Sequence, residues 1–394
     1  MREHRLEVAD VFRSCQDDYF RAFPTSGQQR RVFRALCACR TAALGGHLKR
    51  CDQCGYEKIS YNSCHDRHCP KCQGGARAQW LDARARELLP APYFHIVFTL
   101  PKALAPLALQ NPRTLYSILF RAASETLLTL AADERHLGAR IGFLALLHTW
   151  GQKLDLHPHL HCLVPGGGLS EDQSRWIPSR PRFFLPVDVV SSLFRRKFLH
   201  YLRAAYRQDK LAFHGTLQPL KLPRPFDSFL QSLTHTNWVV YCQPPFAGPE
   251  RVLKYLARYT HRVAISNSRL LSLDQGKLCF RYKDYRHPHQ PRTLTLETTE
   301  FTRRFLLHVL PKGFMRIRHY GILANRHRRT KLTCCRWLLG QDDSPTELIP
   351  SELSSTPDKS EPCPRCQQGP LSLVQTLPPA ATPMQPRMNS PGLP

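Results

Sequence analysis

The sequence predicts an α+β protein, with helices and antiparallel strands in a main domain and a small cysteine- and histidine-rich domain before it. Apolar runs at 94–100 and 141–150 have the length and composition of buried strands. A short turn connects the second run to a third strand at 154–165, so these two strands are expected to pair antiparallel. Residues 102–135 have helical periodicity. The segment 37–74 holds the cysteines and histidines of the smaller domain.

The composition is strongly basic. The 394 residues include 56 lysines and arginines against 30 acidic residues, which gives a net charge of +26 at pH 7. Residues 341–394 hold only three of the basic side chains and six of the acidic ones, so the positive charge belongs to the rest of the chain. This distribution predicts a nucleic-acid partner rather than a membrane surface. An apolar run of transmembrane length and a signal peptide are both absent from the sequence, which favours the cytoplasm.

Four cysteines with regular spacing predict a structural zinc site. Cys51 and Cys54 form one CxxC pair, Cys69 and Cys72 form a second, and fourteen residues separate the pairs. Two such pairs supply the four thiolates of a closed tetrahedral site. The chain has fifteen cysteines, an odd number, and mixes them with histidines. This pattern fits metal binding in a reducing cytoplasm better than a disulfide scaffold.

A second zinc site is an open expectation in the same segment, so one or two structural zinc ions are predicted. Its candidate ligands are Cys39, His47, Cys64 and His68, with Cys37 and His65 as competitors. Near the end of the chain, Cys363 and Cys366 form half of a further zinc knuckle. The candidate partners of that pair are Cys334 and Cys335.

The strand at 154–165 carries candidate ligands for a catalytic metal. His157, His159 and His161 alternate with apolar residues, so in a strand they share one face. Neutral imidazoles side by side suit a divalent ion, whereas the alternative is a polar strand face without a metal. Gln152, in the turn before this strand, offers a side-chain carbonyl as a third ligand for Mg²⁺ or Mn²⁺, unless it is only a turn residue.

A helix predicted over 250–264 is the second element with candidate chemistry. Tyr255 and Tyr259 are four residues apart, so both hydroxyl groups project from one helix face. A tyrosine hydroxyl is a competent nucleophile toward a phosphodiester that a metal polarises and cations hold in line. The alternative for such a pair is ordinary packing. The cations of the adjoining stripe are Arg251, Lys254, Arg258 and Arg262.

Two features mark the C-terminal third of the chain. The segment 314–331 is very basic and is expected to follow a DNA backbone. Its candidate DNA contacts are Arg316, Arg318, Arg328 and Arg329. Residues 341–394 are rich in proline and are predicted to be mostly disordered.

These motifs together resemble a known family. The chain is similar to the HUH rolling-circle transposases of bacterial insertion sequences, in the two-tyrosine family numbered ninety-one. The motifs that carry the resemblance are C-R-T-A-A-L-G-G-H (39–47), the cysteine block (51–72), H-I-V-F-T-L-P (95–101), W-G-Q (150–152), H-P-H-L-H (157–161), Y-L-A-R-Y (255–259) and F-T-R-R-F-L-L-H-V-L-P (301–311).

The resemblance implies an HUH endonuclease domain with a central antiparallel sheet flanked by helices. It also implies metal ligands His159 and His161, with His157 only a neighbour, and nucleophiles Tyr255 and Tyr259. Gln152 enters as the third ligand by analogy with related nucleases.

The expected protein is therefore a transposase that nicks single-stranded DNA at transposon ends, forms a 5′-phosphotyrosine and transfers strands. Its expected parts are an N-terminal helical segment (1–36), a zinc-binding DNA-recognition domain (37–90), a tyrosine nuclease domain (91–340) and the proline-rich tail (341–394). Two alternatives remain open. One is a zinc-dependent DNA-binding regulator without catalysis, and the other is a transposase with a carboxylate triad.

Overall fold

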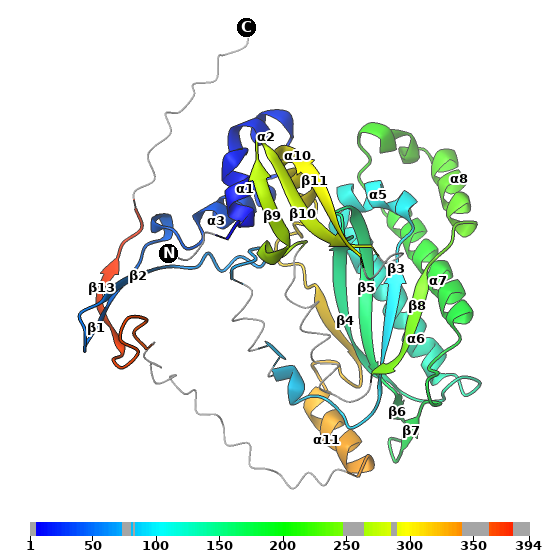
Figure 1. Ribbon diagram of the computed structural model, residues 1–394. Coiled ribbons are helices and arrows are strands. Elements are labelled where there is room, and N and C mark those ends of the chain that lie inside the picture. The colour runs from blue at the N-terminus through cyan, green and yellow to red at the C-terminus, as the bar shows by residue number, and fades with distance from the viewer. Residues whose placement is uncertain are drawn as a thin grey trace.

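A five-stranded antiparallel sheet forms the centre of the protein. The computed structural model describes residues 5–72, 80–81, 83–246, 264–284, 290–340 and 362–380. The strand order of the sheet is β12-β4-β5-β3-β8 (Figure 1). Its strands are β3 (Tyr93–Thr99), β4 (Gly142–Trp150), β5 (Leu156–Pro165), β8 (Val240–Phe246) and β12 (Ile317–Gly321). The predicted α+β class and the antiparallel pairing of β4 with β5 are confirmed.

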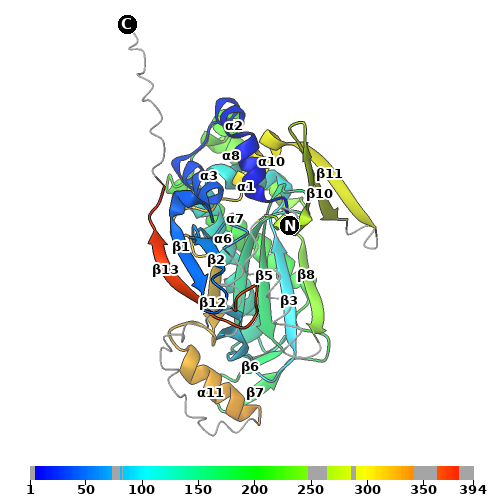
Figure 2. The ribbon, with the colours of Figure 1, turned by 60° about the vertical axis from the view of Figure 1, so that its left-hand side comes forward.

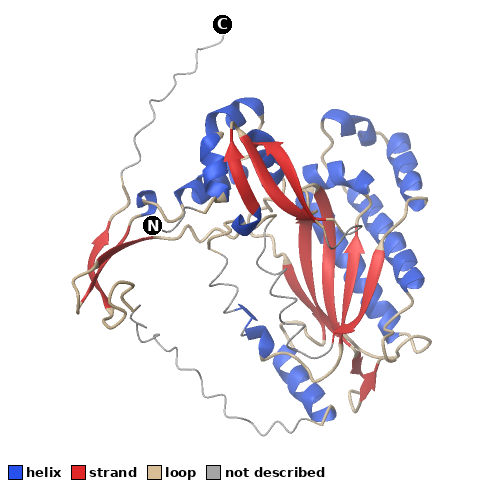
Figure 3. Cartoon of the chain, in the orientation of Figure 1, coloured by secondary structure: helices blue, strands red, loops and turns tan. Residues whose placement is uncertain are grey.

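Helices cover one face of this sheet (Figure 3). They are α5 (Ala105–Gln110), α6 (Pro112–Ala132), α7 (Val187–Arg207) and α8 (Pro223–Thr234). Leu160, Cys162 and Val164 of β5 point toward the helices and are buried in the same core as α6 and α7. Because side chains alternate along a strand, the histidines of β5 point to the opposite face.

A second antiparallel sheet packs against the N-terminal helices. It has the order β11-β10-β9 and is formed by β9 (Leu270–Asp274), β10 (Lys277–Lys283) and β11 (Pro291–Glu297). The helices around it are α1 (Val8–Ser14), α2 (Gln16–Ala22), α3 (Gly27–Ala38) and α10 (Thr298–Leu306). The ring of Phe12 lies 4.8 Å from Phe33 and 5.3 Å from Phe305, so α1, α3 and α10 share one core. The N-terminal helices therefore do not stand apart from the later domain.

A third antiparallel sheet joins the early part of the chain to its C-terminal part. It consists of β1 (Gly46–Cys51), β2 (Glu57–Tyr61) and β13 (Leu371–Leu377), with β1 in the middle. Figure 2 shows β13 alongside β1, and the register runs from Gly46 opposite Leu377 to Cys51 opposite Leu371. Within the tail that is predicted to be mostly disordered, residues 362–380 are folded onto the zinc-binding domain.

The other described elements are short connections and one outlying helix. They are β6 (Gly167–Leu169), β7 (Trp176–Pro178), α11 (Arg328–Leu338) and the 3-10 turns Ala42–Leu44, Lys102–Leu104, Gly215–Lys221 and Asn267–Arg269. Within the described part of the chain, the helices are all too short or too polar to cross a membrane.

Candidate metal centre and cysteine sites

Three histidines lie together on the face of the central sheet that points away from the helices. His159 and His161 belong to β5, and His148 of β4 lies directly opposite His159. Directly opposite residues of antiparallel strands point to the same face, so His148 joins the other two. One ring nitrogen from each residue lies within 4.8 Å of the others, which makes the group a candidate metal centre.

An irregularity in the β4–β5 pairing lies next to this histidine group. The regular register ends at His148 and resumes with Trp150 opposite Leu156. Pro158 is the β5 residue beside the break, and a proline has no N–H to donate to a neighbouring strand. A bulge here accommodates a proline between two histidines of β5.

Neighbouring groups orient each imidazole. The Nδ1 atom of His159 lies 2.6 Å from the carbonyl oxygen of His157. The Nδ1 atom of His161 lies 2.8 Å from Nε2 of His95, and these two rings are stacked. The indole of Trp150 stacks on His148 with ring centroids 4.4 Å apart. With Nδ1 of His159 and His161 engaged in this way, Nε2 becomes the ligand atom of both rings.

Burial keeps the imidazoles of His159 and His161 neutral at physiological pH. It lowers the pKa of His159 to about 4 and places the pKa of His161 well below its ordinary value. A neighbouring His148 ring lowers the pKa of His161 further. Because a metal ion binds the neutral imidazole, the group is prepared for a divalent cation without losing protons first.

The structure places Gln152 in the turn between β4 and β5. Its side-chain Oε1 accepts a hydrogen bond of 3.4 Å from the backbone N–H of Lys283, and its carbonyl accepts one of 2.6 Å from Arg269. Both partners belong to the second sheet or the turn that precedes it. Gln152 therefore joins that sheet to the β4–β5 turn. Its role as a metal ligand stays a prediction, and His148 supplies the third nitrogen of the histidine group.

A buried histidine of the C-terminal motif holds the same turn. His308 follows α10, and its Nδ1 lies 3.2 Å from the Thr149 hydroxyl while its Nε2 donates to the Leu154 carbonyl at 3.2 Å. Burial lowers the pKa of His308 to about 4. His308 thus fixes both ends of the turn that precedes the metal-binding strand.

The candidate nucleophiles lie outside the described residues. Tyr255 and Tyr259 fall there, as do the cations predicted around them, Arg251, Lys254, Arg258 and Arg262. The structure neither brings them to the histidine group nor separates them from it.

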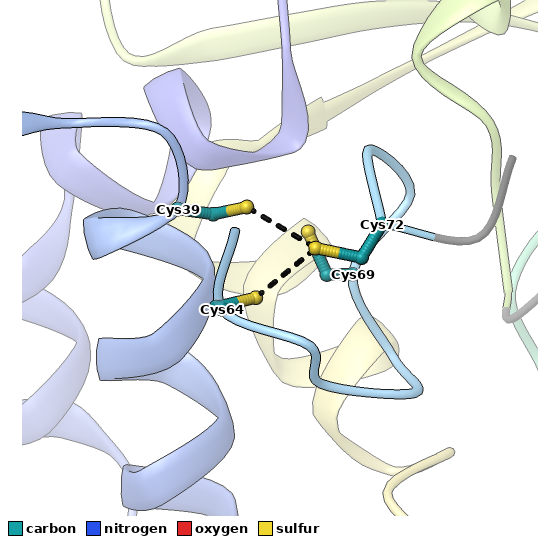
Figure 4. Close-up of side chains that lie close together, drawn as sticks. All are labelled: Cys39, Cys64, Cys69 and Cys72. Atoms are coloured by element: carbon teal, nitrogen blue, oxygen red, sulfur yellow. Dashed lines mark hydrogen bonds between the residues drawn. The ribbon is translucent and has the colours of Figure 1, made fainter. Parts of the chain in front are cut away.

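Four cysteines form a first sulfur group between α3 and the loop that follows β2. Cys39 comes from the end of α3, Cys64 follows β2, and Cys69 and Cys72 form a CxxC pair (Figure 4). The sulfur of Cys72 lies 3.4 Å from that of Cys39 and 3.6 Å from that of Cys64. The Cys64 thiol is the main cause that lowers the pKa of Cys69 to about 5, so Cys69 favours the thiolate form that zinc binds.

The predicted quartet of Cys51, Cys54, Cys69 and Cys72 needs a correction. Cys51 and Cys54 lie with Cys363 and Cys366 in a second sulfur group, and Cys69 and Cys72 lie in the first. The hairpin is the reason, because β1 carries the chain about 16 Å along the strand before Cys51 is reached. Strand β2 then returns the chain to Cys64 beside Cys39. The two CxxC pairs therefore sit at opposite ends of one hairpin.

Of the predicted second zinc set, the structure brings Cys39 and Cys64 into the first sulfur group. His47 lies on β1 opposite Ser60, outside both sulfur groups. His68 is buried, with Nδ1 2.8 Å from Asp66 and Nε2 accepting from the Leu310 N–H at 3.3 Å. Both of its ring nitrogens have protein partners, so His68 joins domains instead of binding zinc.

The four arginines after residue 314 that are predicted to contact DNA differ from one another in their surroundings. Burial lowers the pKa of Arg316 to about 10, and its carbonyl is bonded to β4. The guanidinium of Arg318 lies 4.1 Å from the Phe120 ring, and Arg328 pairs with Glu87 at 3.2 Å. Arg329 is exposed. Of these four, Arg329 is the side chain most accessible to a DNA backbone.

Sequence reasoning missed His148 and the partner of the C-terminal cysteine pair. The hairpin register alone could not have found His148, since counting back from Trp150 opposite Leu156 places it opposite Pro158, and only the β-bulge moves it opposite His159. The sequence holds no local signal for Cys363 and Cys366. Their partners, Cys51 and Cys54, are 309 or more residues away.

Known proteins resemble the chain over most of its length. A model described as "Transposase zinc-binding domain" matches residues 11–100, and one described as "Putative transposase" matches residues 142–331. The transposase y4qJ of Sinorhizobium fredii is 54% identical over 94% of this chain and 95% of its own. The transposase for insertion sequence element IS801 of Pseudomonas savastanoi pv. phaseolicola is 32% identical over 74% of this chain and 69% of its own.

Among solved structures, the conjugative relaxase TrwC in complex with oriT DNA aligns with 44% of this chain and 65% of its own at 14% identity. The TM-score of 0.22 is too low to support any argument. Family membership rests instead on the two matched domains and on the two relatives at 54% and 32% identity. The chain belongs to the IS91 family of insertion-sequence transposases and carries the N-terminal zinc-binding domain of that family.

Proposed function

We propose that this transposase nicks single-stranded DNA at transposon ends by metal-assisted tyrosine attack and then transfers the strand, as in rolling-circle transposition. The observation that carries the proposal is the group of His148, His159 and His161, whose ring nitrogens lie within 4.8 Å of one another on one face of an antiparallel sheet. A chain with a net charge of +26 attracts the phosphates of DNA.

The three histidines fit a divalent metal ion. Their imidazoles are held in place by His157, His95 and Trp150, and the low pKa values of His159 and His161 keep both rings neutral. An ion bound there would neutralise charge on a scissile phosphate. Three nitrogen ligands favour a transition metal such as Mn²⁺ over Mg²⁺, which prefers oxygen ligands. We therefore place Mn²⁺ ahead of Mg²⁺.

Tyr255 or Tyr259 is the proposed nucleophile. The phenol oxygen bonds to phosphorus and loses its proton, while the bond from phosphorus to the 3′-oxygen breaks and that oxygen gains a proton. The products are a 5′-phosphotyrosine and a free 3′-hydroxyl. The new ester conserves the energy of the broken one, so no nucleotide is consumed. The residues proposed to hold the phosphate oxygens are Arg251, Lys254, Arg258 and Arg262.

Replacing both tyrosines by phenylalanine tests this function. The double variant Y255F/Y259F, incubated with Mn²⁺ and labelled single-stranded transposon-end DNA, is expected to give no covalent adduct on denaturing gels. The matched control is Tyr241→Phe, a tyrosine that is 54% exposed on β8 of the same sheet and is expected to leave the adduct unchanged. Gel-shift binding by the double variant shows that it is folded.

Persistence of the adduct in Y255F/Y259F would contradict the tyrosine assignment. Specific DNA binding by the wild-type chain without any adduct would favour a regulator without catalysis. A carboxylate-triad enzyme has less support, because the metal-binding groups found among the described residues contain only cysteine and histidine.

A further inference from the structure

We propose that Cys51, Cys54, Cys363 and Cys366 form a second zinc site, separate from the first sulfur group, that fastens the C-terminal strand β13 to the N-terminal domain. The four sulfur atoms lie within 4.8 Å of one another. Cys51 lies 3.6 Å from Cys366, and Cys54 lies 3.6 Å from Cys363. The four cysteines bring residues 51–54 and 363–366 together. The second of these segments lies outside the matched domains, which end at residue 331.

The spacing of the sulfur atoms fits a zinc ion. A zinc–sulfur bond of about 2.3 Å places the corners of a tetrahedron about 3.8 Å apart. The observed separation of 3.6 Å is close to that value. A disulfide needs about 2.05 Å, and all four cysteines are free thiols. The group is therefore arranged for a metal ion and not for two disulfide bonds.

The two cysteine pairs also have the same local backbone. Gly55 follows the first pair with φ +69°, and Gln367 follows the second with φ +57°. The N–H of Gly55 donates to the Cys51 carbonyl at 3.0 Å, and that of Gln367 donates to the Cys363 carbonyl at 2.8 Å. Two loops of one shape thus face each other, each presenting both of its sulfur atoms.

The packing of β13 explains why a metal ion is needed there. Only Leu371 of this strand is buried, while Leu373 is 58% exposed and Val374 is 47% exposed. A strand that buries so little apolar surface is held weakly by backbone hydrogen bonds alone. The second sulfur group lies at one end of the strand, where Leu371 is opposite Cys51. A metal ion there supplies the free energy that the small core lacks.

Gly369 shows how closely the two segments approach. A Cβ atom on this residue would lie 2.8 Å from the Cys51 sulfur and 2.6 Å from the Gln53 side chain. The hydroxyl of Ser372 donates to the Asp52 carboxylate at 2.6 Å, which adds a polar contact beside the sulfur group. The C-terminal knuckle is therefore fitted to the β1–β2 turn.

The test removes the C-terminal pair from the full-length protein. The C363S/C366S variant is expected to hold one zinc ion fewer per chain than the wild type by elemental analysis. Amide hydrogen exchange in residues 372–377 is expected to become at least about tenfold faster, while exchange in the central sheet stays unchanged. The reciprocal variant C51S/C54S is expected to show the same two effects. The control is C279S/C334S, which removes two half-buried thiols outside both sulfur groups.

Unchanged zinc content in C363S/C366S would overturn the proposal, and so would a lost zinc ion with unchanged protection of β13. Cobalt titration of the wild-type chain keeps the test decisive if a variant misfolds. Two equivalents of Co²⁺ with thiolate charge-transfer absorption support two sulfur sites, and saturation at one equivalent contradicts them. Histidine ligands give no such absorption, so the result is independent of the nicking reaction.

Discussion

Replacing a single side chain, His148 of β4, distinguishes between the two candidates for the third metal ligand. The H148A variant is expected to bind Mn²⁺ at least about tenfold more weakly, because one of three nitrogen ligands is lost. Q152A is expected to change the affinity less than about threefold, since its Oε1 is bonded to the Lys283 N–H. Isothermal titration with Mn²⁺ measures both.

The opposite ranking, with Q152A weakening Mn²⁺ binding and H148A leaving it unchanged, would restore Gln152 as the third ligand. The matched control is His200→Ala, which removes an exposed imidazole from α7. Its Mn²⁺ affinity is expected to equal that of the wild type.

The sequence predicted the residues of the histidine group whose signal is local. His159 and His161 are two positions apart on one strand, so their shared face follows from strand geometry alone. His148 depends on the register between two strands, and a register is fixed only when the turn and the bulge are known. His68 was misassigned because its sequence neighbours are cysteines. The N–H that actually bonds its ring belongs to Leu310, which is 242 residues away in the sequence.

His308 attaches the β4–β5 turn to the end of α10, and this contact makes the stability of the protein depend on pH. His308 has a pKa of about 4 in the folded protein, whereas an unfolded histidine titrates near 6.5. As the pH falls below 6.5, the unfolded chain takes up this proton first, so stability is lost between about pH 6.5 and pH 4. As the pH falls from 7 to 5, protonation of His308 is expected to lower the free energy of unfolding by about 2 kcal/mol.

The H308Q variant is expected to be less stable than the wild type at pH 7 but to lose about 2 kcal/mol less on going to pH 5. Urea unfolding at the two pH values gives the comparison. An H200Q control, on an exposed histidine, keeps the wild-type difference. Equal pH dependence in H308Q and the wild type would show that His308 titrates normally in the folded protein.

Elements whose apolar pattern is strong were predicted well, whereas the contacts between distant elements were not. Strands β3, β4 and β5 are apolar enough to be recognised alone. The N-terminal helices were expected as a separate segment, yet Phe12 and Phe33 pack with Phe305 in one core. Such packing depends on contacts between distant parts of the chain, and hydrophobic periodicity shows only that a face is buried, not what covers it.

Over the whole molecule, Arg67 connects the loop of the first sulfur group to the central domain. Its guanidinium donates to the carbonyls of Leu310, Pro311 and Phe314 at 3.4, 2.9 and 2.8 Å. The R67A variant leaves these carbonyls without that partner, so its free energy of unfolding is expected to fall by about 3 kcal/mol. Zinc content is expected to stay at the wild-type value, because the sulfur atoms are untouched. Thermal and urea unfolding with zinc analysis measures both.

The control for this prediction is Arg50→Ala in the same domain. Arg50 pairs with Glu57 at 2.6 Å on the surface, and an exposed pair contributes less than about 1 kcal/mol. If R67A and R50A were equally stable, the three carbonyl contacts would not hold the domains together.

The pairing of β13 with β1 also has a consequence for protein synthesis. Strand β1 leaves the ribosome more than 300 residues before Leu371, its partner opposite Cys51. Until then the growing polypeptide presents the backbone of β1 along one side, a surface that invites pairing with other nascent chains. A chain truncated after residue 340 would keep His148, His159 and His161 but would lack β13, so the edge of β1 would stay uncovered.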